Sequence, residues 1–352
     1  MTSVRRLLRS ALLALLALAL VAPAGAALAA CGGSAAGPAP STSATASSSS
    51  PAPGAAASPA ATARPTQTVK PAAGATPGAV LKDLAYADAS PYQRLDLYLP
   101  VNGTAPYPVI VAIHGGGFEA GSKGDGQVGP MIEGAKRGYA VAAIDYRLSG
   151  EAIFPAAIQD VKASIRWLRA NAARYRLDPA RFAAWGDSAG GNLAALAGTS
   201  AGVPALSDPA LGNAGQSDAV QAVVDWFGPI SFLKVDDDFR ASRAGAGGHS
   251  SGGSFESQYL GAPLASVPDK VRAADPITYI SAGDPPFLIQ HGDADATVPV
   301  QQSQRLAAAL RKVIGPQNVE LTIFPGAGHM TPAIYSAANA EYVLDWLDAK
   351  LK

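Results

Sequence analysis

Apolar runs that alternate with helical patterns constrain the fold of this chain more than any other feature. From about Ala79 onward, short continuous apolar runs recur, as expected of strands that are covered on both faces. These runs lie at residues 109–113, 140–144, 182–185, 220–227, 287–289 and 319–324. Between them, apolar residues at three- and four-residue steps indicate amphipathic helices, as over 158–168 and 335–346. This order predicts an α/β fold with a mostly parallel central sheet and helices on both faces.

The first thirty residues have the pattern of a secretory signal. Three arginines precede an apolar run over residues 11–21, and small residues lead up to Cys31. The run is shorter than the about 20 apolar residues that span a membrane. Leu-Ala-Ala-Cys resembles the bacterial lipobox, which implies cleavage after residue 30 and lipidation of Cys31. We therefore expect an exported protein anchored to the outer face of a membrane, or a secreted one if the signal is of the ordinary cleaved type.

The next segment, residues 31–76, is rich in Ala, Ser, Pro, Gly and Thr and has almost no large apolar side chains. Such a segment cannot bury enough surface to offset its ordering entropy, so it is predicted to be a disordered tether. The folded domain is then expected over residues 77–352. The formal net charge is zero, which argues against a nucleic acid partner, and one cysteine allows neither an intramolecular disulfide nor a thiol-based metal site.

A Gly-Asp-Ser-Ala-Gly motif centred on Ser188 follows the apolar run 182–185 and precedes a helical run of small residues. This is the context of a nucleophile elbow, a sharp strand-to-helix turn that exposes a serine hydroxyl. Its glycines are needed because side chains there would collide with the adjacent strand and helix. Such motifs arise by chance in Gly- and Ala-rich chains, but the strand and helix on either side favour the elbow. Ser188 is therefore the candidate nucleophile.

A second glycine-rich motif, His-Gly-Gly-Gly-Phe, begins at His114 directly after the apolar run 109–113. Residues without side chains let backbone N–H groups approach a developing oxyanion closely. We expect Gly116, Gly117 and Ala189 to donate these N–H groups. The alternative, a plain glycine-rich turn, is weakened because the motif occurs together with the elbow.

The candidate base follows from the order of residues along the chain. Of the four histidines, His114 belongs to the glycine-rich motif and His249 lies in an irregular segment. In elbow-type hydrolases the partners follow in the order serine, acid, histidine. His291 precedes the acidic pair at positions 293 and 295, whereas His329 follows it in a Gly-Ala-Gly-His loop. His329 is therefore the predicted base.

The candidate acid is one of two aspartates. Asp293 and Asp295 both follow the apolar run 287–289, and from spacing alone either could orient the imidazole of His329. A carboxylate in this role fixes the histidine tautomer and stabilises the imidazolium.

These motifs together resemble the α/β-hydrolase superfamily, and most closely its Bacteroidetes-type feruloyl esterase-like hydrolases. The resemblance extends from about Leu81 to Leu351. It is carried by Leu-Asp-Leu-Tyr-Leu-Pro at 95–100, His-Gly-Gly-Gly at 114–117, Asp-Tyr-Arg-Leu at 145–148, Phe-Pro-Ala-Ala-Ile-Gln-Asp-Val at 154–161, Gly-Asp-Ser-Ala-Gly-Gly at 186–191 and His-Gly-Asp-Ala-Asp-Ala-Thr-Val-Pro at 291–299. In the last motif the family's acid is the aspartate four residues after the histidine, which implies Asp295.

The resemblance implies a serine esterase that works through an acyl-enzyme without a cofactor or metal. It implies small-molecule or polysaccharide-linked substrates, such as acetyl or feruloyl esters. The hormone-sensitive-lipase-like esterases share two of the motifs, but they carry an N-terminal helical cap that is not expected here. A peptidase and a non-catalytic cell-surface binding module are the alternatives; the intact set of motifs argues against the latter.

Three further segments lead to structural predictions. Residues 231–274 break the alternation with Gly, Ser and charged residues, so they are either a lid or substrate-binding excursion or a plain surface insertion. Within 145–148, Asp145 and Arg147 are interpreted as a buried ion pair that braces the glycine-rich loop. Trp226 and Phe227 are expected in the core rather than in a substrate wall.

Overall fold

The computed structural model describes residues 76–242 and 247–352. The expected signal peptide, lipidation site and tether over residues 1–75 lie outside the described residues. Within the described residues, no helix is both long and apolar enough to span a membrane. The described residues of the predicted hydrolase domain fall within a single compact unit.

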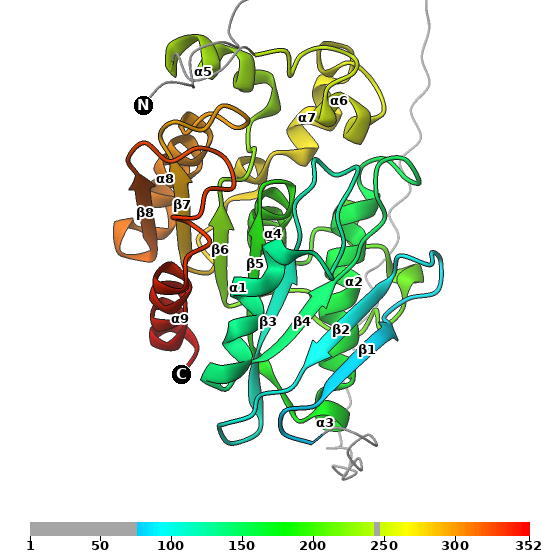
Figure 1. Ribbon diagram of the computed structural model, residues 1–352. Helices are drawn as coiled ribbons and strands as arrows, with labels where there is room; N and C mark the ends of the chain where they lie inside the picture. The colour runs from blue at the N-terminus through cyan, green and yellow to red at the C-terminus, as the bar shows by residue number, and fades with distance from the viewer. Residues whose placement is uncertain (1–75, 243–246) are drawn as a thin grey trace, which may run out of the picture. The chain divides into compact units, whose positions relative to one another are not determined.

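The sheet has eight strands in the order β1-β2-β4-β3-β5-β6-β7-β8 (Figure 1). The first two strands pair antiparallel, β2 also pairs antiparallel with β4, and all pairs from β4 to β8 are parallel. This confirms the prediction of a mostly parallel sheet. The strands are β1 (Val80–Ala85), β2 (Arg94–Tyr98), β3 (Tyr107–Ile113), β4 (Ala140–Ile144), β5 (Leu177–Asp187), β6 (Ala222–Trp226), β7 (Phe287–Gly292) and β8 (Val319–Phe324).

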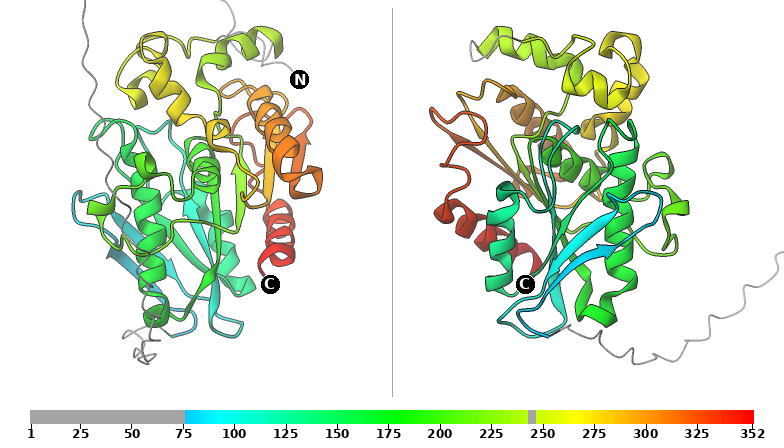
Figure 2. Two further views of the ribbon diagram at one scale, coloured as in Figure 1. Left: turned by 180° about the vertical axis from the view of Figure 1, so that it is seen from behind. Right: turned by 45° about the vertical axis from the view of Figure 1, so that its right-hand side comes forward.

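Helices cover both faces of this sheet, as the two views in Figure 2 show. On one face pack α2 (Ala156–Ala170), α3 (Ala172–Tyr175), α4 (Ala189–Thr199) and α8 (Gln301–Ile314). On the other face pack α1 (Gly129–Ile132) and α9 (Ala337–Leu351). The longest of these helices, α2 and α9, lie where helices were predicted. The predicted apolar stripe of α9 is wrong, because Tyr342 is exposed and the helix instead buries Val343, Leu344 and Leu347.

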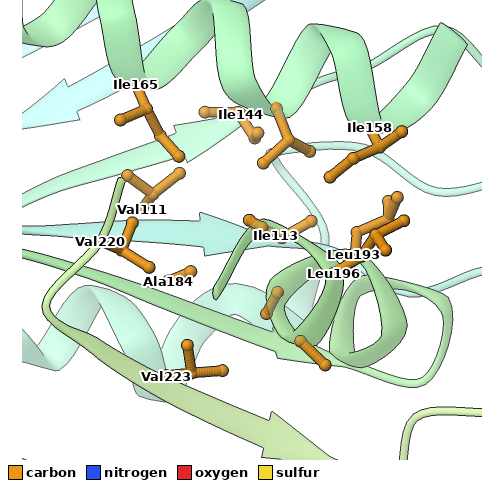
Figure 3. Packing of buried hydrophobic residues seen from close by; sticks show 14 of the residues in the cluster. Val111, Ile113, Ile144, Ile158, Ile165, Ala184, Leu193, Leu196, Val220 and Val223 are labelled. Atoms are coloured by element: carbon orange, nitrogen blue, oxygen red, sulfur yellow. The ribbon is translucent and has the colours of Figure 1, made fainter. Parts of the chain in front are cut away.

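The core lies in two layers because successive side chains of a strand point to opposite faces. In β3, Val109, Val111 and Ile113 enter one cluster, whereas Ile110 and Ala112 enter the other. Figure 3 shows the first cluster, in which Val111 and Ile113 meet side chains of α2 and α4. Every residue of β3 is buried, which explains its continuous apolar run. Burial on both faces thus fixes this strand at the centre of the domain.

The excursion after β6 is largely helical. It contains α5 (Val235–Ser242), α6 (Phe255–Leu260) and α7 (Pro268–Ala274). In Figure 1 these helices lie beyond the carboxyl ends of the parallel strands, the edge from which the loops carrying Ser188 and His329 also emerge. This arrangement lets the excursion contribute side chains to a site at that edge.

The interpretation of Asp145 and Arg147 as an ion pair is wrong. Arg147 instead binds Asp160 of α2, with Nη2 2.8 Å from one carboxylate oxygen and Nε 2.9 Å from the other. Asp145 accepts a hydrogen bond of 2.6 Å from the backbone N–H of Lys123. The two residues are close enough in the sequence to form an ion pair, but after β4 their side chains contact different partners.

A buried carboxyl at the end of β6 gives the fold a pH dependence. Burial raises the pKa of Asp225 to about 6 from 3.8, although a hydrogen bond from Gly228 and the charge of His291 oppose the shift. The folded state therefore keeps this proton to higher pH than the unfolded chain, so stability is lost as the pH rises from about 4 through about 6.

We therefore expect Asp225→Asn, which does not titrate, to gain stability relative to the wild type over this range. The gain should approach about 3 kcal/mol between pH 4 and pH 8, measured by urea unfolding at both values. All other titrating groups are common to both proteins. A stability difference that stays constant with pH would contradict the assignment.

Candidate active site

Ser188 lies at the turn between β5 and α4, in a backbone conformation with φ of 52° and ψ of −121°. This strained conformation is typical of a nucleophile elbow. The turn is tight enough that a Cβ on Gly190 would lie 2.1 Å from the carbonyl oxygen of Ile113. The motif's glycine is therefore required by the close approach of α4 to β3.

The structure brings Ser188, His329 and Asp295 together in a hydrogen-bonded row. Ser188 Oγ lies 3.1 Å from His329 Nε2, and His329 Nδ1 lies 2.7 Å from Asp295 Oδ2. Residues 141 positions apart in the chain thus meet at one edge of the sheet. Both distances are within the range for a nucleophile and a base that a third group orients.

Both carboxylate oxygens of Asp295 have hydrogen-bonding partners. Its Oδ1 accepts 2.8 Å hydrogen bonds from the backbone N–H groups of Thr297 and Val298, and Oδ2 faces His329. Buried His291 lies on the same side, with Nε2 3.3 Å from Oδ2. Burial alone would raise the pKa of Asp295, but hydrogen bonds from His291 and His329 outweigh it and hold the pKa well below its usual value.

Asp293, the other aspartate considered, is not directed at the imidazole. Its Oδ1 accepts a 2.6 Å hydrogen bond from the backbone N–H of Gly326. It thereby fastens the loop that carries His329 rather than contacting the ring. The geometry therefore favours Asp295 as the partner of His329.

The glycine-rich loop after β3 lies beside Ser188. Within the described part of the chain, the backbone N–H groups of Gly116 and Gly117 donate no hydrogen bond. Both residues line the same cavity as Ser188 and Ala189. Unused donors that border the nucleophile are what an oxyanion site requires.

Asp187, beside the nucleophile, fixes this loop. It accepts a 3.1 Å hydrogen bond from the backbone N–H of Gly115 and a 2.7 Å hydrogen bond from the hydroxyl of Tyr335. Burial raises the pKa of Asp187 to about 6 against the opposing effects of these donors and of His329. Its side chain thus connects the elbow, the glycine-rich loop and the segment before α9.

These groups surround a cavity of about 320 Å³. The catalytic candidates form one wall, and the excursion forms another with His249, Phe255 and Glu256. The volume is at the lower end of the about 300–1,000 Å³ that is usual for ligand pockets. The site therefore suits a small group at the reacting carbon.

Sequence reasoning missed several residues around the catalytic candidates. Trp226 and Phe227 are buried in the core, as predicted, but the ring of Phe227 also packs edge-on at 4.8 Å from the ring of His329. His291 contacts Asp295, and His249 lines the cavity although it lies in the irregular segment. No sequence signal identifies these contacts, because they depend on how separate loops meet in the folded chain.

Replacing Gly116 by alanine tests the role of the loop. A Cβ there would lie 2.2 Å from the carbonyl oxygen of Ala120, and φ is +110°, so the loop must shift. We expect kcat to fall about 100-fold, since removal of one oxyanion donor costs about 10²–10³. Gly126→Ala, where the Cβ has no atom within 4 Å, is the matched control. Equal kcat values for the two variants, measured with one ester, would count against an oxyanion role for the loop.

The sheet order and the strand-to-helix turn at Ser188 define this protein as an α/β-hydrolase. The family model BD-FAE matches residues 95–310, and the chain belongs to this family. This confirms the resemblance seen in the sequence motifs.

Relatives and solved structures agree with this assignment. The probable carboxylic ester hydrolase LipM of Mycobacterium tuberculosis is 32% identical over 73% of this chain and 58% of its own length. Esterase LipQ of the same organism is 32% identical over 68% of this chain and 55% of its own. The chain thus spans little more than half the length of these curated relatives.

Two solved structures of esterases share the fold. A truncated carbohydrate esterase from gut microbiota is 31% identical, with a TM-score of 0.68, and the match covers 80% of this chain and 99% of that one. Esterase 2 of Thermogutta terrifontis with bound propionate is 27% identical, with a TM-score of 0.57 over 76% of this chain and 92% of that one.

Proposed function

We propose that this protein is a serine carboxylesterase that hydrolyses acyl esters through Ser188, His329 and Asp295. The observation that carries the proposal is the hydrogen-bonded row of these three side chains, with 3.1 Å and 2.7 Å between the paired atoms. The esterase names of the relatives support the same reaction.

The reaction proceeds in two halves. His329 Nε2 takes the proton of Ser188 as the hydroxyl attacks the ester carbonyl, and Asp295 stabilises the imidazolium that forms. Gly116, Gly117 and Ala189 donate their backbone N–H groups to the oxyanion. The alcohol leaves with the proton from His329. Water, activated by the same imidazole, then releases the acid and restores Ser188.

The proposed substrates are esters of short acyl groups, with acetyl esters of polysaccharides first and feruloyl esters second. The cavity of about 320 Å³ supports a small acyl group. The carbohydrate esterase among the structural neighbours supports a sugar-bearing alcohol, and the neighbour with bound propionate supports a short acid.

Hydrolysis of p-nitrophenyl acetate, longer p-nitrophenyl esters and methyl ferulate by the purified protein tests this function. We expect the acetate to have the highest kcat/KM of the series, and a fluorophosphonate probe to label Ser188. If the protein is inert toward every ester and is not labelled, the proposal fails and a non-catalytic binding module takes its place.

We further propose that the protein is an exported lipoprotein attached through Cys31. The support is the signal pattern and the lipobox-like sequence that ends at this sole cysteine. Stable membrane attachment then requires at least two acyl chains, since one acyl chain alone binds only marginally. Mass spectrometry of the mature N-terminus tests this proposal: an unmodified N-terminus at any position would overturn it.

A further inference from the structure

The excursion after β6 contributes a second hydrogen-bonded histidine pair to the cavity. His249 Nδ1 lies 2.7 Å from Oε1 of Glu256, and both residues line the cavity that contains Ser188. Neither belongs to the row of Ser188, His329 and Asp295. Neither His249 nor Glu256 has a role in the proposed mechanism.

The pair is held in place by the surrounding chain. Both carboxylate oxygens of Asp236 accept backbone hydrogen bonds from residues 248–250, at 2.8–2.9 Å. On the other side, α6 carries Glu256 and is fixed to the glycine-rich loop because Tyr259 stacks on Phe118 at 3.9 Å. The pair is therefore preorganised, which lowers the entropy cost of binding a ligand.

The pair also has unused hydrogen-bonding capacity. The side chain of Glu256 is only 3% exposed, and its Oε2 is buried without a hydrogen-bond partner. Among the described residues, only Nδ1 of the two ring nitrogens of His249 makes a hydrogen bond. Because Oε2 is enclosed, a ligand in the cavity reaches the pair through the second ring nitrogen of His249, and Glu256 sets the orientation of that ring.

The chemistry of the pair selects the group that fits. A carboxylate would be repelled by Glu256, and an alkyl group would leave the polar atoms unpaired. A hydroxyl group both donates and accepts, so it can bind either protonation state of the imidazole of His249. Phe255, which is 43% exposed, lines the cavity next to the pair and offers an apolar surface to the carbon atoms of such a ligand.

We propose that His249 and Glu256 form a subsite that binds a hydroxyl group of the substrate. This inference rests on the proposed esterase function and deepens it, because it makes hydroxylated esters the preferred substrates. The hydroxyl group belongs either to the alcohol, as in a partly acetylated sugar, or to the acyl group.

Two pairs of esters that differ by one hydroxyl group test the subsite in the full chain. For the alcohol side the pair is trans-2-hydroxycyclohexyl acetate and cyclohexyl acetate; for the acyl side it is ethyl 3-hydroxybutyrate and ethyl butyrate. We expect the wild type to prefer the hydroxylated member of one pair about tenfold in kcat/KM, as one hydrogen bond to a buried polar pair allows. The pair that shows the preference identifies the source of the hydroxyl group.

The variants His249→Ala and Glu256→Ala should lower kcat/KM for the hydroxylated ester about tenfold more than for its partner. Glu256→Gln, which keeps an acceptor for the imidazole, should retain part of the preference. Gln258→Ala, on the same helix with its side chain bonded to Gly253, is the control and should keep the full preference.

Three results would overturn the subsite. The wild type could treat both members of each pair alike, or the variants could lose activity toward both members equally, which indicates a structural role. A wild type that hydrolyses p-nitrophenyl acetate but none of the four esters would also overturn the subsite. A wild type that is inert toward p-nitrophenyl acetate as well, and is not labelled by a fluorophosphonate, would overturn the proposed function itself.

Discussion

Replacing Ser188 by alanine will reduce kcat for ester hydrolysis by about 10⁶, the typical cost of removing a triad serine. Ser188 Oγ is the atom that lies 3.1 Å from His329 Nε2, and alanine has no atom to transfer a proton or form the acyl-enzyme. The loss should appear in kcat, because groups that bind the substrate remain in place. Residual hydrolysis above the rate in water is expected from the oxyanion donors alone.

The measurement is steady-state hydrolysis of p-nitrophenyl acetate beside labelling with a fluorophosphonate. Ser266→Ala, at an exposed serine in the excursion, is the matched control and should keep full activity and labelling. Thermal unfolding verifies that Ser188→Ala is folded. A folded variant that retains more than about a hundredth of wild-type kcat would exclude Ser188 as the nucleophile.

Replacing Asp295 by asparagine will reduce kcat by about 10⁴, because it forces the wrong tautomer on His329. Thr297 and Val298 both donate backbone hydrogen bonds to Oδ1, so an asparagine must keep its oxygen there. Its NH₂ group then faces His329 Nδ1, 2.7 Å away, and that nitrogen must accept rather than donate. The proton moves to Nε2, which can no longer take the proton of Ser188.

Asp293→Asn is the control for this experiment. Asp293 holds the backbone of Gly326 and does not contact the imidazole, so its replacement should lower kcat by less than about tenfold. Comparison of kcat for the two variants on the same ester therefore separates the two aspartates. A larger loss in Asp293→Asn than in Asp295→Asn would reverse the assignment.

The positions of the strands along the chain were predictable because strands buried on both faces appear in the sequence as continuous apolar runs. Val109 to Ile113 and Ala140 to Ile144 read as continuous apolar runs, and both are fully buried neighbours in the sheet. The order of strands in the sheet was not predictable, because a parallel strand bonds to partners far away in the chain. Strand β1 has largely exposed residues, and so it lacks the alternation that identifies β2.

The candidate site was predictable where a motif requires special backbone geometry or a fixed order of residues. Ser188 is marked by a turn that tolerates only glycine at positions 186 and 190, and His329 by its place after the acidic pair. The hydrogen-bond and contact partners of a side chain cannot be predicted from a local motif, since they depend on how separate loops meet in space. This is why Arg147 was assigned to Asp145 instead of Asp160, and why the approach of His249 to Ser188 was missed.

Asp187 makes the nucleophile and the glycine-rich loop a single mechanical unit. Its carboxyl group holds Gly115 and Tyr335 while its own backbone carries Ser188, so a shift in any one of these segments is transmitted to the others. Attempts to widen acyl selectivity by redesigning the glycine-rich loop will therefore alter the reactive hydroxyl as well. The hydrogen bonds of Asp187 reach Gly115 and Tyr335 but not the excursion bearing His249, which makes the excursion the better place to evolve new substrate preferences.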